Sequence, residues 1–100
     1  MATTSKVLFR GAASTSSTTL YTTPSATTTI VTNILVTNTV SADATFNILL
    51  DDVSAATLVT VGGYDTTVID LKQALGASKT IKGLASATTV NFHISGVEIA

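Results

Sequence analysis

The sequence predicts an all-β fold: a single antiparallel β-sandwich of about eight strands, with either jelly-roll or immunoglobulin-like connectivity. Apolar and polar residues alternate with a period of two in most segments, and no segment sustains a helical period. Turn residues recur roughly every 8 to 12 positions, which is typical of sandwiches of short strands. Thr, whose branched side chain suits pleated strands, is the commonest residue at 21 of 100. This length allows one two-layer core, so residues 1–100 are expected to form a single domain.

Residues 1–17 are expected to form an extended N-terminal arm and a loop. Ser5–Arg10 (SKVLFR) predicts a short strand or arm, and Gly11–Ser17 (GAASTSS) predicts a loop of small residues. Such an arm either stays disordered or pairs with the sheet edge of a neighbouring protein. Thr18–Thr22 predicts a strand, which Pro24 ends because proline has no amide for a β-ladder.

Thr28–Asn38 predicts the longest strand, with apolar side chains on both faces, as expected of a central strand. Strict alternation places one set of residues on one face and the rest on the other: Ile30, Thr32, Ile34 and Val36, against Val31, Asn33 and Leu35. Ala44–Leu50 alternates cleanly and predicts a core-facing strand that ends at Asp51-Asp52.

Ala56–Val61 and Thr66–Leu71 predict two further strands. The glycine pair Gly62-Gly63 between them suits a tight connection, so the two strands are expected to form a hairpin. Lys72–Leu75 is too short for a secure helix and is predicted to be a loop.

Thr80–Ser86 and Val90–Ile99 predict the last two strands. The apolar residues of the final strand change parity along its length: Val90, Phe92 and Ile94, then Val97 and Ile99. One extra residue at Ser95-Gly96 would explain the change, so a β-bulge is predicted there.

Charged residues are scarce: they make up 11% of the chain, and none occurs between Gly11 and Ala42. A soluble domain usually carries about 25%. The 21 Thr and 10 Ser residues therefore predict a surface of hydroxyl and methyl groups, which loses little solvation when another protein covers it. Two interpretations remain open: strand propensity alone, or a surface buried in an assembly.

Several partner classes are not expected. Five basic residues against six acidic ones give a net charge of −1, without the basic stripe that binds nucleic acid. The absence of cysteine removes disulfides and thiolate chemistry. The stretch MATTSKVLFRGAAST has no apolar signal core, and no apolar run reaches the roughly 18 residues of a membrane span. No membrane association is therefore predicted.

The sequence predicts no catalytic, cofactor-binding or metal-binding residue. His93 is the only histidine, and alternation places it opposite the face of Phe92. A general base needs an orienting partner and a metal needs three or four ligands, but the chain has no second histidine and no cysteine. The glycines and serines form no phosphate-binding loop and no nucleophile elbow. We therefore expect a protein that is not an enzyme and takes no cofactor.

The acidic residues at strand ends allow two interpretations. Asp51-Asp52 and Asp65 have the ligand chemistry of a calcium site, but paired aspartates at a turn more often only end a strand, and we favour that role. Three lysines are expected near Asp65 and Asp70 as a solvated, salt-bridged rim: Lys72, Lys79 and Lys82.

Four residues are the predicted interface positions: Tyr21, Asn33, Tyr64 and His93. The two tyrosines combine apolar area with a polar tip, which suits interface anchors. Asn33 and His93 are expected to face outward from their strands.

Three stretches together resemble the small Thr-rich β-sandwich structural proteins of tailed-bacteriophage virions: LYTTPSATTTIVTNILVTNT (Leu20–Thr39), VIDLKQALGASKTIKG (Val68–Gly83) and ASATTVNFHISGVEI (Ala85–Ile99). The resemblance covers most of the chain and is weakest over residues 1–17 and 52–65. It carries no catalytic residue.

This resemblance implies a non-enzymatic virion component assembled in the cytoplasm of a bacterial host. The expected role is a capsid decoration (cement) protein that stabilises the head. The alternative is a collar, tail or fibre component, including a module that binds the host surface. The implied partners are the major capsid protein or another virion protein, and further copies of the chain, with a homotrimer favoured.

Overall fold

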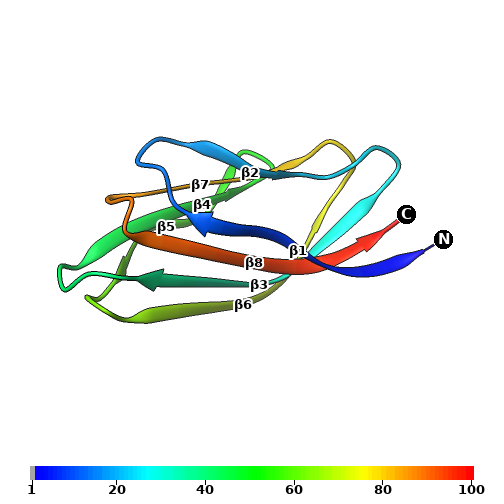
Figure 1. Cartoon of the computed structure of the whole chain (residues 1–100). Coiled ribbons are helices and arrows are strands. Elements are labelled where there is room, and N and C mark those ends of the chain that lie inside the picture. The colour runs from blue at the N-terminus through cyan, green and yellow to red at the C-terminus, as the bar shows by residue number, and fades with distance from the viewer. Residues whose placement is uncertain (1) are drawn as a thin grey trace.

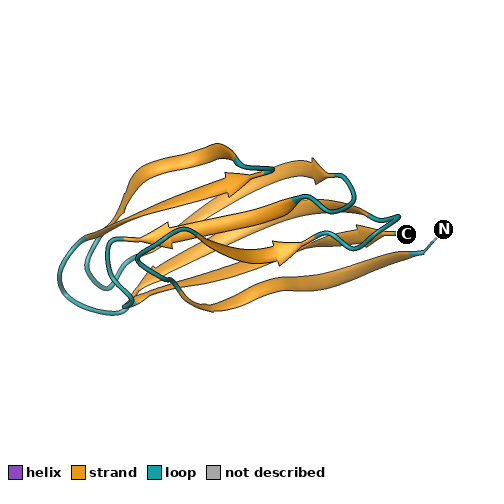
Figure 2. Cartoon of the chain, turned by 90° about the horizontal axis from the view of Figure 1, so that it is seen from above, coloured by secondary structure: helices purple, strands orange, loops and turns teal. Residues whose placement is uncertain are grey.

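The computed structural model describes residues 2–100, which form eight strands and no helix. The strands are β1 (Thr3–Ala12), β2 (Thr18–Thr22), β3 (Thr28–Asn38), β4 (Ala44–Leu50), β5 (Val53–Val61), β6 (Thr66–Leu75), β7 (Thr80–Ala85) and β8 (Val90–Ile99). They make two four-stranded antiparallel sheets that pack together as an elongated sandwich (Figures 1 and 2). Sheet A has the order β1-β8-β3-β6 and sheet B the order β2-β7-β4-β5. The predicted all-β sandwich is confirmed.

The strand order selects the jelly roll from the two predicted connectivities. In an immunoglobulin sandwich the first two strands are neighbours in one sheet, whereas here β1 pairs with β8. Every connection passes from one sheet to the other except the turn between β4 and β5. This alternation is the double Greek key of a jelly roll.

The turn between β4 and β5 is a two-residue hairpin loop. Leu50 pairs with Val53, and both Asp51 (φ 55°) and Asp52 (φ 60°) have left-handed backbone conformations. Positive φ at both central residues defines a type I′ turn, whose twist matches that of the flanking strands. The predicted end of β4 at this aspartate pair is confirmed.

Two predictions on the central part of the chain are wrong. β5 lies in sheet B and β6 in sheet A, so they are not a hairpin; the connection at Gly62-Gly63 instead crosses between the sheets. Lys72–Leu75 is not a loop, because β6 runs to Leu75, which is buried and pairs with Thr29. The hairpin was wrong because alternation identifies strands but not which strands are neighbours. The loop was wrong because the strand conformation of Lys72–Leu75 depends on pairing with β3, which the four residues alone do not reveal.

β1 is longer than predicted and belongs to the sheet of its own chain. It pairs with β8 from Thr3 opposite Ile99 to Ala12 opposite Asn91. In this structure the N-terminal segment is therefore an edge strand, and the two ends of the chain lie side by side (Figure 1).

The bulge predicted in β8 is on its neighbours instead. Leu8 on β1 is the extra residue opposite the step from Ile94 to Ser95, and Thr32 on β3 is the extra residue opposite the step from Ser95 to Gly96. The alternation of β8 continues without a break, so its last apolar residues, Val97 and Ile99, face outward.

The bulge at Thr32 changes the parity of β3. Val31 and Ile34 both face the core, and Ile30 and Leu35 face outward, so the predicted faces of this strand are wrong on the N-terminal side of the bulge. The inward position of Gly96 is suited only to glycine, because a Cβ there would lie 2.4 Å from the carbonyl oxygen of Ile30.

The core lies between the sheets and contains an aromatic pair. Phe46 of sheet B and Phe92 of sheet A are fully buried, with ring centroids 6.0 Å apart and planes at 70°. This edge-to-face arrangement is the favourable one for two aromatic rings. The other large and fully buried apolar residues surround the pair: Val31, Ile34, Val36, Ile48, Val61, Ile81, Val90 and Ile94.

Candidate interaction surfaces

The outer face of sheet A carries a continuous row of side chains across all four strands. Arg10, His93, Leu35 and Val68 are successive cross-strand partners on β1, β8, β3 and β6. This row faces away from the core, because side chains alternate along a strand and Phe92, the residue next to His93, is buried.

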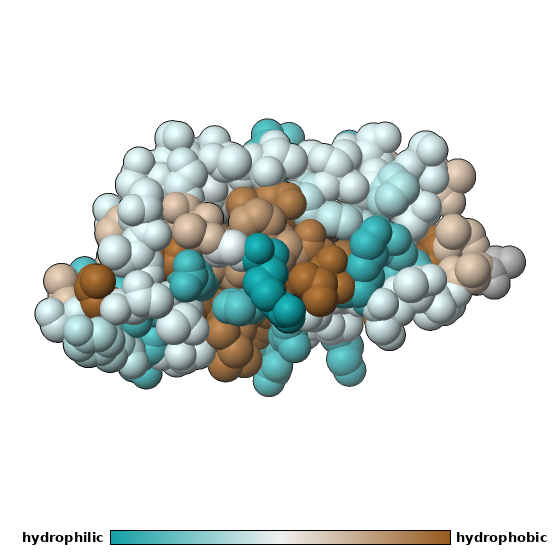
Figure 3. Space-filling model, viewed as in Figure 1, coloured by the Kyte–Doolittle hydropathy of each residue, from teal (hydrophilic) through white to brown (hydrophobic). Residues whose placement is uncertain are grey.

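Apolar groups are frequent on this face. They are Val7, Ile30, Leu35, Val68, Val97 and Ile99. Val68 is 57% exposed and Val7 47% exposed. Figure 3 shows hydrophobic side chains over the middle of the molecule, with hydrophilic groups among them. The outward charged residues are Arg10, Asp70 and Lys72 on the edge strands, so the outward positions of the central strands β3 and β8 carry hydroxyl, amide, imidazole and apolar groups.

His93 and Asn33, two of the predicted interface residues, lie on this face. Asn33 pairs with Ser95 on β8 and with Asp70 on β6, which places it in the middle of the sheet. Arg10 Nε donates a hydrogen bond to His93 Nδ1 at 3.0 Å. An accepting Nδ1 requires the neutral tautomer with its proton on Nε2. His93 is thus held by a cation and not by the carboxylate that usually orients a catalytic histidine.

The two tyrosines occupy different places. Tyr64 lies in the connection between β5 and β6 with φ 56° and is 74% exposed. Tyr21 is partly buried, and its hydroxyl donates to Glu98 Oε2 and lies 2.8 Å from Thr29 Oγ1. The polar tip of Tyr21 is therefore used within the chain.

Tyr21 and Glu98 shift the pKa of each other's acid group. The pKa of Tyr21 is raised, first by burial and then by the hydrogen bond to Glu98. The pKa of Glu98 is lowered, chiefly by that hydrogen bond, and Lys6 at 3.3 Å lowers it further. Both shifts favour the pair of a neutral phenol and a carboxylate.

The charged residues at the strand ends form a rim that differs from the predicted one. Lys79 pairs with Asp51 at 3.5 Å, and Lys82 pairs with Asp52 at 2.6 Å. Asp65 instead accepts a hydrogen bond from the backbone amide of Thr66. The expected ion pairs to Asp65 and Asp70 are therefore replaced by pairs to the β4–β5 turn. Within residues 2–100, no three His, Asp or Glu side chains come together as a metal site.

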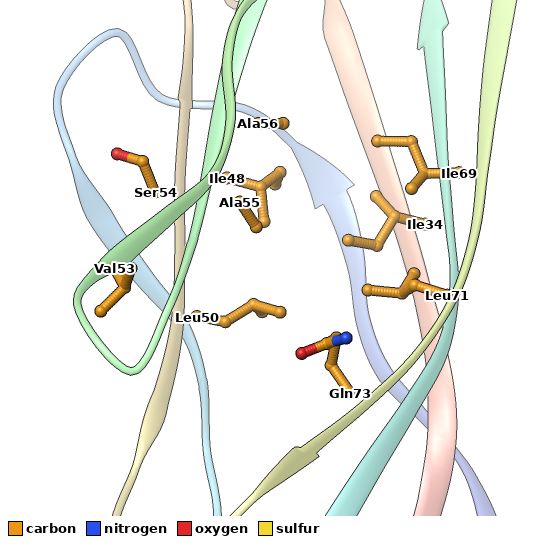
Figure 4. A pocket seen from close by; sticks show the side chains of 10 residues that line it. All are labelled: Ile34, Ile48, Leu50, Val53, Ser54, Ala55, Ala56, Ile69, Leu71 and Gln73. Atoms are coloured by element: carbon orange, nitrogen blue, oxygen red, sulfur yellow. The ribbon is translucent and has the colours of Figure 1, made fainter.

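A groove opens between β5 and β6, the edge strands on one side of the sandwich (Figure 4). Its volume is about 440 Å³. Apolar side chains of both sheets face each other across it, and the Gln73 amide points into it at one end. The groove is lined by Ile34, Ile48, Leu50, Val53, Ser54, Ala55, Ala56, Ile69, Leu71 and Gln73.

The groove was not predicted from the sequence. On the β5 side it is lined by the small side chains of Ala55 and Ala56, which leave space between the two edge strands. The predicted hairpin of β5 and β6 in one sheet leaves no groove between them. The groove exists because the two strands belong to different sheets.

In the part of the chain that the structure describes, no helix is long and apolar enough to cross a membrane. Comparison with known proteins finds no family model that matches the chain and no curated protein that is similar to it.

Proposed function

We propose that this protein is a non-enzymatic structural component of a tailed-bacteriophage virion, and that it decorates the capsid as a cement protein. The observation that carries the proposal is the outer face of sheet A, where the outward positions of the two central strands have no charged side chain. Covering such a face removes apolar groups and hydroxyls from water at a low desolvation cost.

Two further features support the proposal. The jelly roll is an architecture that viral capsid proteins share with lectins and cupins, and it agrees with the resemblance of Leu20–Thr39 and Ala85–Ile99 to virion sandwiches. Fold alone does not define a function, so the argument rests mainly on the surface. The only histidine is hydrogen-bonded to Arg10, which does not favour a hydrolytic enzyme.

A cement protein of this kind acts by mass action. A protein that binds the assembled shell and not its dissociated subunits shifts the equilibrium toward the shell. Asn33 and His93 are the polar groups in the middle of the proposed docking face, and they would set its specificity through hydrogen bonds to the major capsid protein.

A collar, tail or fibre component is the alternative, and Tyr64 is the observation that favours it. This side chain is 74% exposed in a connection between the sheets. An exposed aromatic ring is a usual platform for binding a sugar of the host surface. The rest of that connection contributes Gly62, Gly63 and Asp65.

The test is co-sedimentation of the purified protein with expanded, undecorated capsids from the same genome. We expect binding that saturates at a fixed ratio to the capsid protein. Asn33→Lys, which adds a charge in the middle of the face, is expected to weaken binding at least tenfold. Thr45→Lys is the matched control, because Thr45 faces outward from β4 at the centre of sheet B.

Failure of the wild-type protein to sediment with capsids would overturn the decoration proposal and favour the collar, tail or fibre. Equal loss of binding in Asn33→Lys and Thr45→Lys, with both variants folded, would contradict the assignment of the docking face to sheet A.

A further inference from the structure

We propose that the open side of the sandwich, formed by β5 and β6, is the docking site for a second copy of this chain, in an edge-to-edge dimer with two-fold symmetry. This contact runs along the side of the sandwich and meets the outer face of sheet A at β6, and it does not depend on the proposed function.

The open side presents apolar groups that the fold leaves uncovered. Val53 is 67% exposed and Leu58 is 68% exposed, both on β5. The groove of about 440 Å³ lies directly beside Val53, and its walls continue into the core through Ile34 and Ile48. A second copy along this side would cover both the exposed side chains and the mouth of the groove.

Comparison of the four edge strands distinguishes β5 from the others. β1 carries two charges of the same sign, Lys6 and Arg10, whereas β6 carries Asp70 and Lys72, which have opposite signs. β2 has only five residues and is followed by Pro24. Edge strands are normally protected from pairing by charges, proline, bulges or short length. β5 has nine residues, VSAATLVTV, with no charge and no proline. Its register against β4 shifts at Ala55 and again between Ala56 and Val59, so a second copy would mainly cover its exposed apolar side chains.

The charges on the same side are self-complementary. Asp70 and Lys72 are exposed and two residues apart on β6, and neither takes part in an ion pair among residues 2–100. In a two-fold contact, residue i meets residue j and residue j meets residue i. An axis passing near Leu71 would therefore place Asp70 against Lys72 of the other copy, twice. The uncharged β5 edges would meet without repulsion.

The contact is large enough for a specific dimer. β5 is nine residues long, which corresponds to about 30 Å at the usual rise of a strand. The molecule is 18 to 21 Å across its two short axes. A contact along this side would bury roughly 500 Å² on each copy and about 1,000 Å² in total, which is about the least that a specific interface buries.

The first measurement is the mass of the purified full chain by light scattering. We expect twice the 10.2 kDa of one chain. Ala55→Lys, which places a charge at the mouth of the groove, and Val53→Lys are each expected to give a monomer with an unchanged circular dichroism spectrum. Thr19→Lys is the matched control, because Thr19 is exposed on β2, the edge strand on the opposite side of sheet B; it is expected to remain a dimer.

Cross-linking provides a second measurement that does not depend on disrupting the contact. The chain has no cysteine, so Ala55→Cys introduces a single thiol on β5. Oxidation is expected to join two copies through this position, whereas Thr19→Cys is expected to stay uncross-linked at the same concentration.

A wild-type monomer or a homotrimer would overturn the two-fold dimer, as would a dimer that survives both Ala55→Lys and Val53→Lys. These results are separable from the test of function. A dimer that ignores capsids keeps this proposal and removes the cement role, and a monomer that binds capsids does the opposite.

Discussion

Tyr21 on β2 and Glu98 on β8 connect the two sheets of the sandwich through a hydrogen bond from the phenol to the carboxylate. The phenol has one proton, which it donates to Glu98, so the hydroxyl of Thr29 must donate to the oxygen of Tyr21. Lys6 completes the group by pairing with Glu98 at 3.3 Å. The connection lies near the paired chain ends, where Ala2 and Ala100 exchange backbone hydrogen bonds.

The Glu98 carboxylate is expected to make the fold less stable in acid. Its pKa is lowered below the ordinary 4.5, chiefly by the hydrogen bond from Tyr21. A lowered pKa in the folded state gives stability that is fully present above the ordinary pKa and is lost as the pH falls through the folded value. The thermal midpoint should therefore decrease below pH 4.5, and decrease less in Glu98→Gln. Identical acid profiles for the two proteins would contradict this role.

The Tyr21 hydroxyl is expected to have the opposite dependence in alkali. Burial and the bond to Glu98 raise its pKa above the ordinary 10.0, so the stabilisation is present below that pH and is lost as the phenol ionises at higher pH. The difference in tyrosinate absorbance between the wild-type protein and Tyr21→Phe should have its midpoint above pH 10.0. A midpoint at or below 10.0 would contradict the effect of burial and of the hydrogen bond to Glu98 on this phenol.

Sequence patterns predicted the strands well and their pairing poorly. Alternation in Ala44–Leu50 located β4 with its bounds, because one of its faces is buried along its whole length and the other is not. The hairpin predicted at Gly62-Gly63 was wrong, because a glycine pair suits a connection between two sheets as well as it suits a turn within one sheet. The strand order of a jelly roll depends on contacts between residues far apart in the chain, and no local pattern contains them.

The bulges explain the remaining errors on the faces of strands. An apolar residue out of parity in β8 was attributed to an extra residue at Gly96, but Val97 simply faces outward and the extra residues are Leu8 and Thr32. The sequence of a single strand does not distinguish an apolar residue that faces outward from one that a bulge has turned toward the core. The outward Val97 is itself informative, because it belongs to the face that we propose to bind the capsid.

Gly63 is expected to be indispensable for the crossing between β5 and β6. A Cβ at this position would lie 2.0 Å from the carbonyl oxygen of Ser41, and a backbone atom cannot move aside as a side chain does. Gly63→Ala should therefore lower the free energy of unfolding by about 1–3 kcal/mol or prevent folding. Gly76→Ala is the matched control: a Cβ there meets nothing within 4 Å, and the change should be neutral or slightly stabilising. Chemical denaturation of both variants measures the difference.

The Phe46–Phe92 pair is expected to stabilise the fold by more than the burial of its two rings alone would. Phe46→Ala and Phe92→Ala should each lower the free energy of unfolding by about 3–5 kcal/mol, because removal of a buried phenyl ring leaves a cavity between the sheets. The rings meet edge to face at 6.0 Å, so a double-mutant cycle should give a coupling of about 0.5–1.5 kcal/mol. Leucine replacements provide the cycle if the alanine variants do not fold. Strict additivity would indicate that the two rings only fill space.

His93→Ala is expected to leave the fold intact and to affect binding alone. The side chain lies on the outer face of sheet A, and its hydrogen bond with Arg10 is exposed, so its removal should cost less than about 1 kcal/mol. The variant should keep the thermal midpoint of the wild-type protein within a few degrees and bind undecorated capsids more weakly. Arg10→Ala is the companion variant, since it frees His93 Nδ1 without removing the imidazole from the face. A large loss of stability in His93→Ala, with capsid binding unchanged, would assign the residue to the fold and remove it from the proposed docking surface.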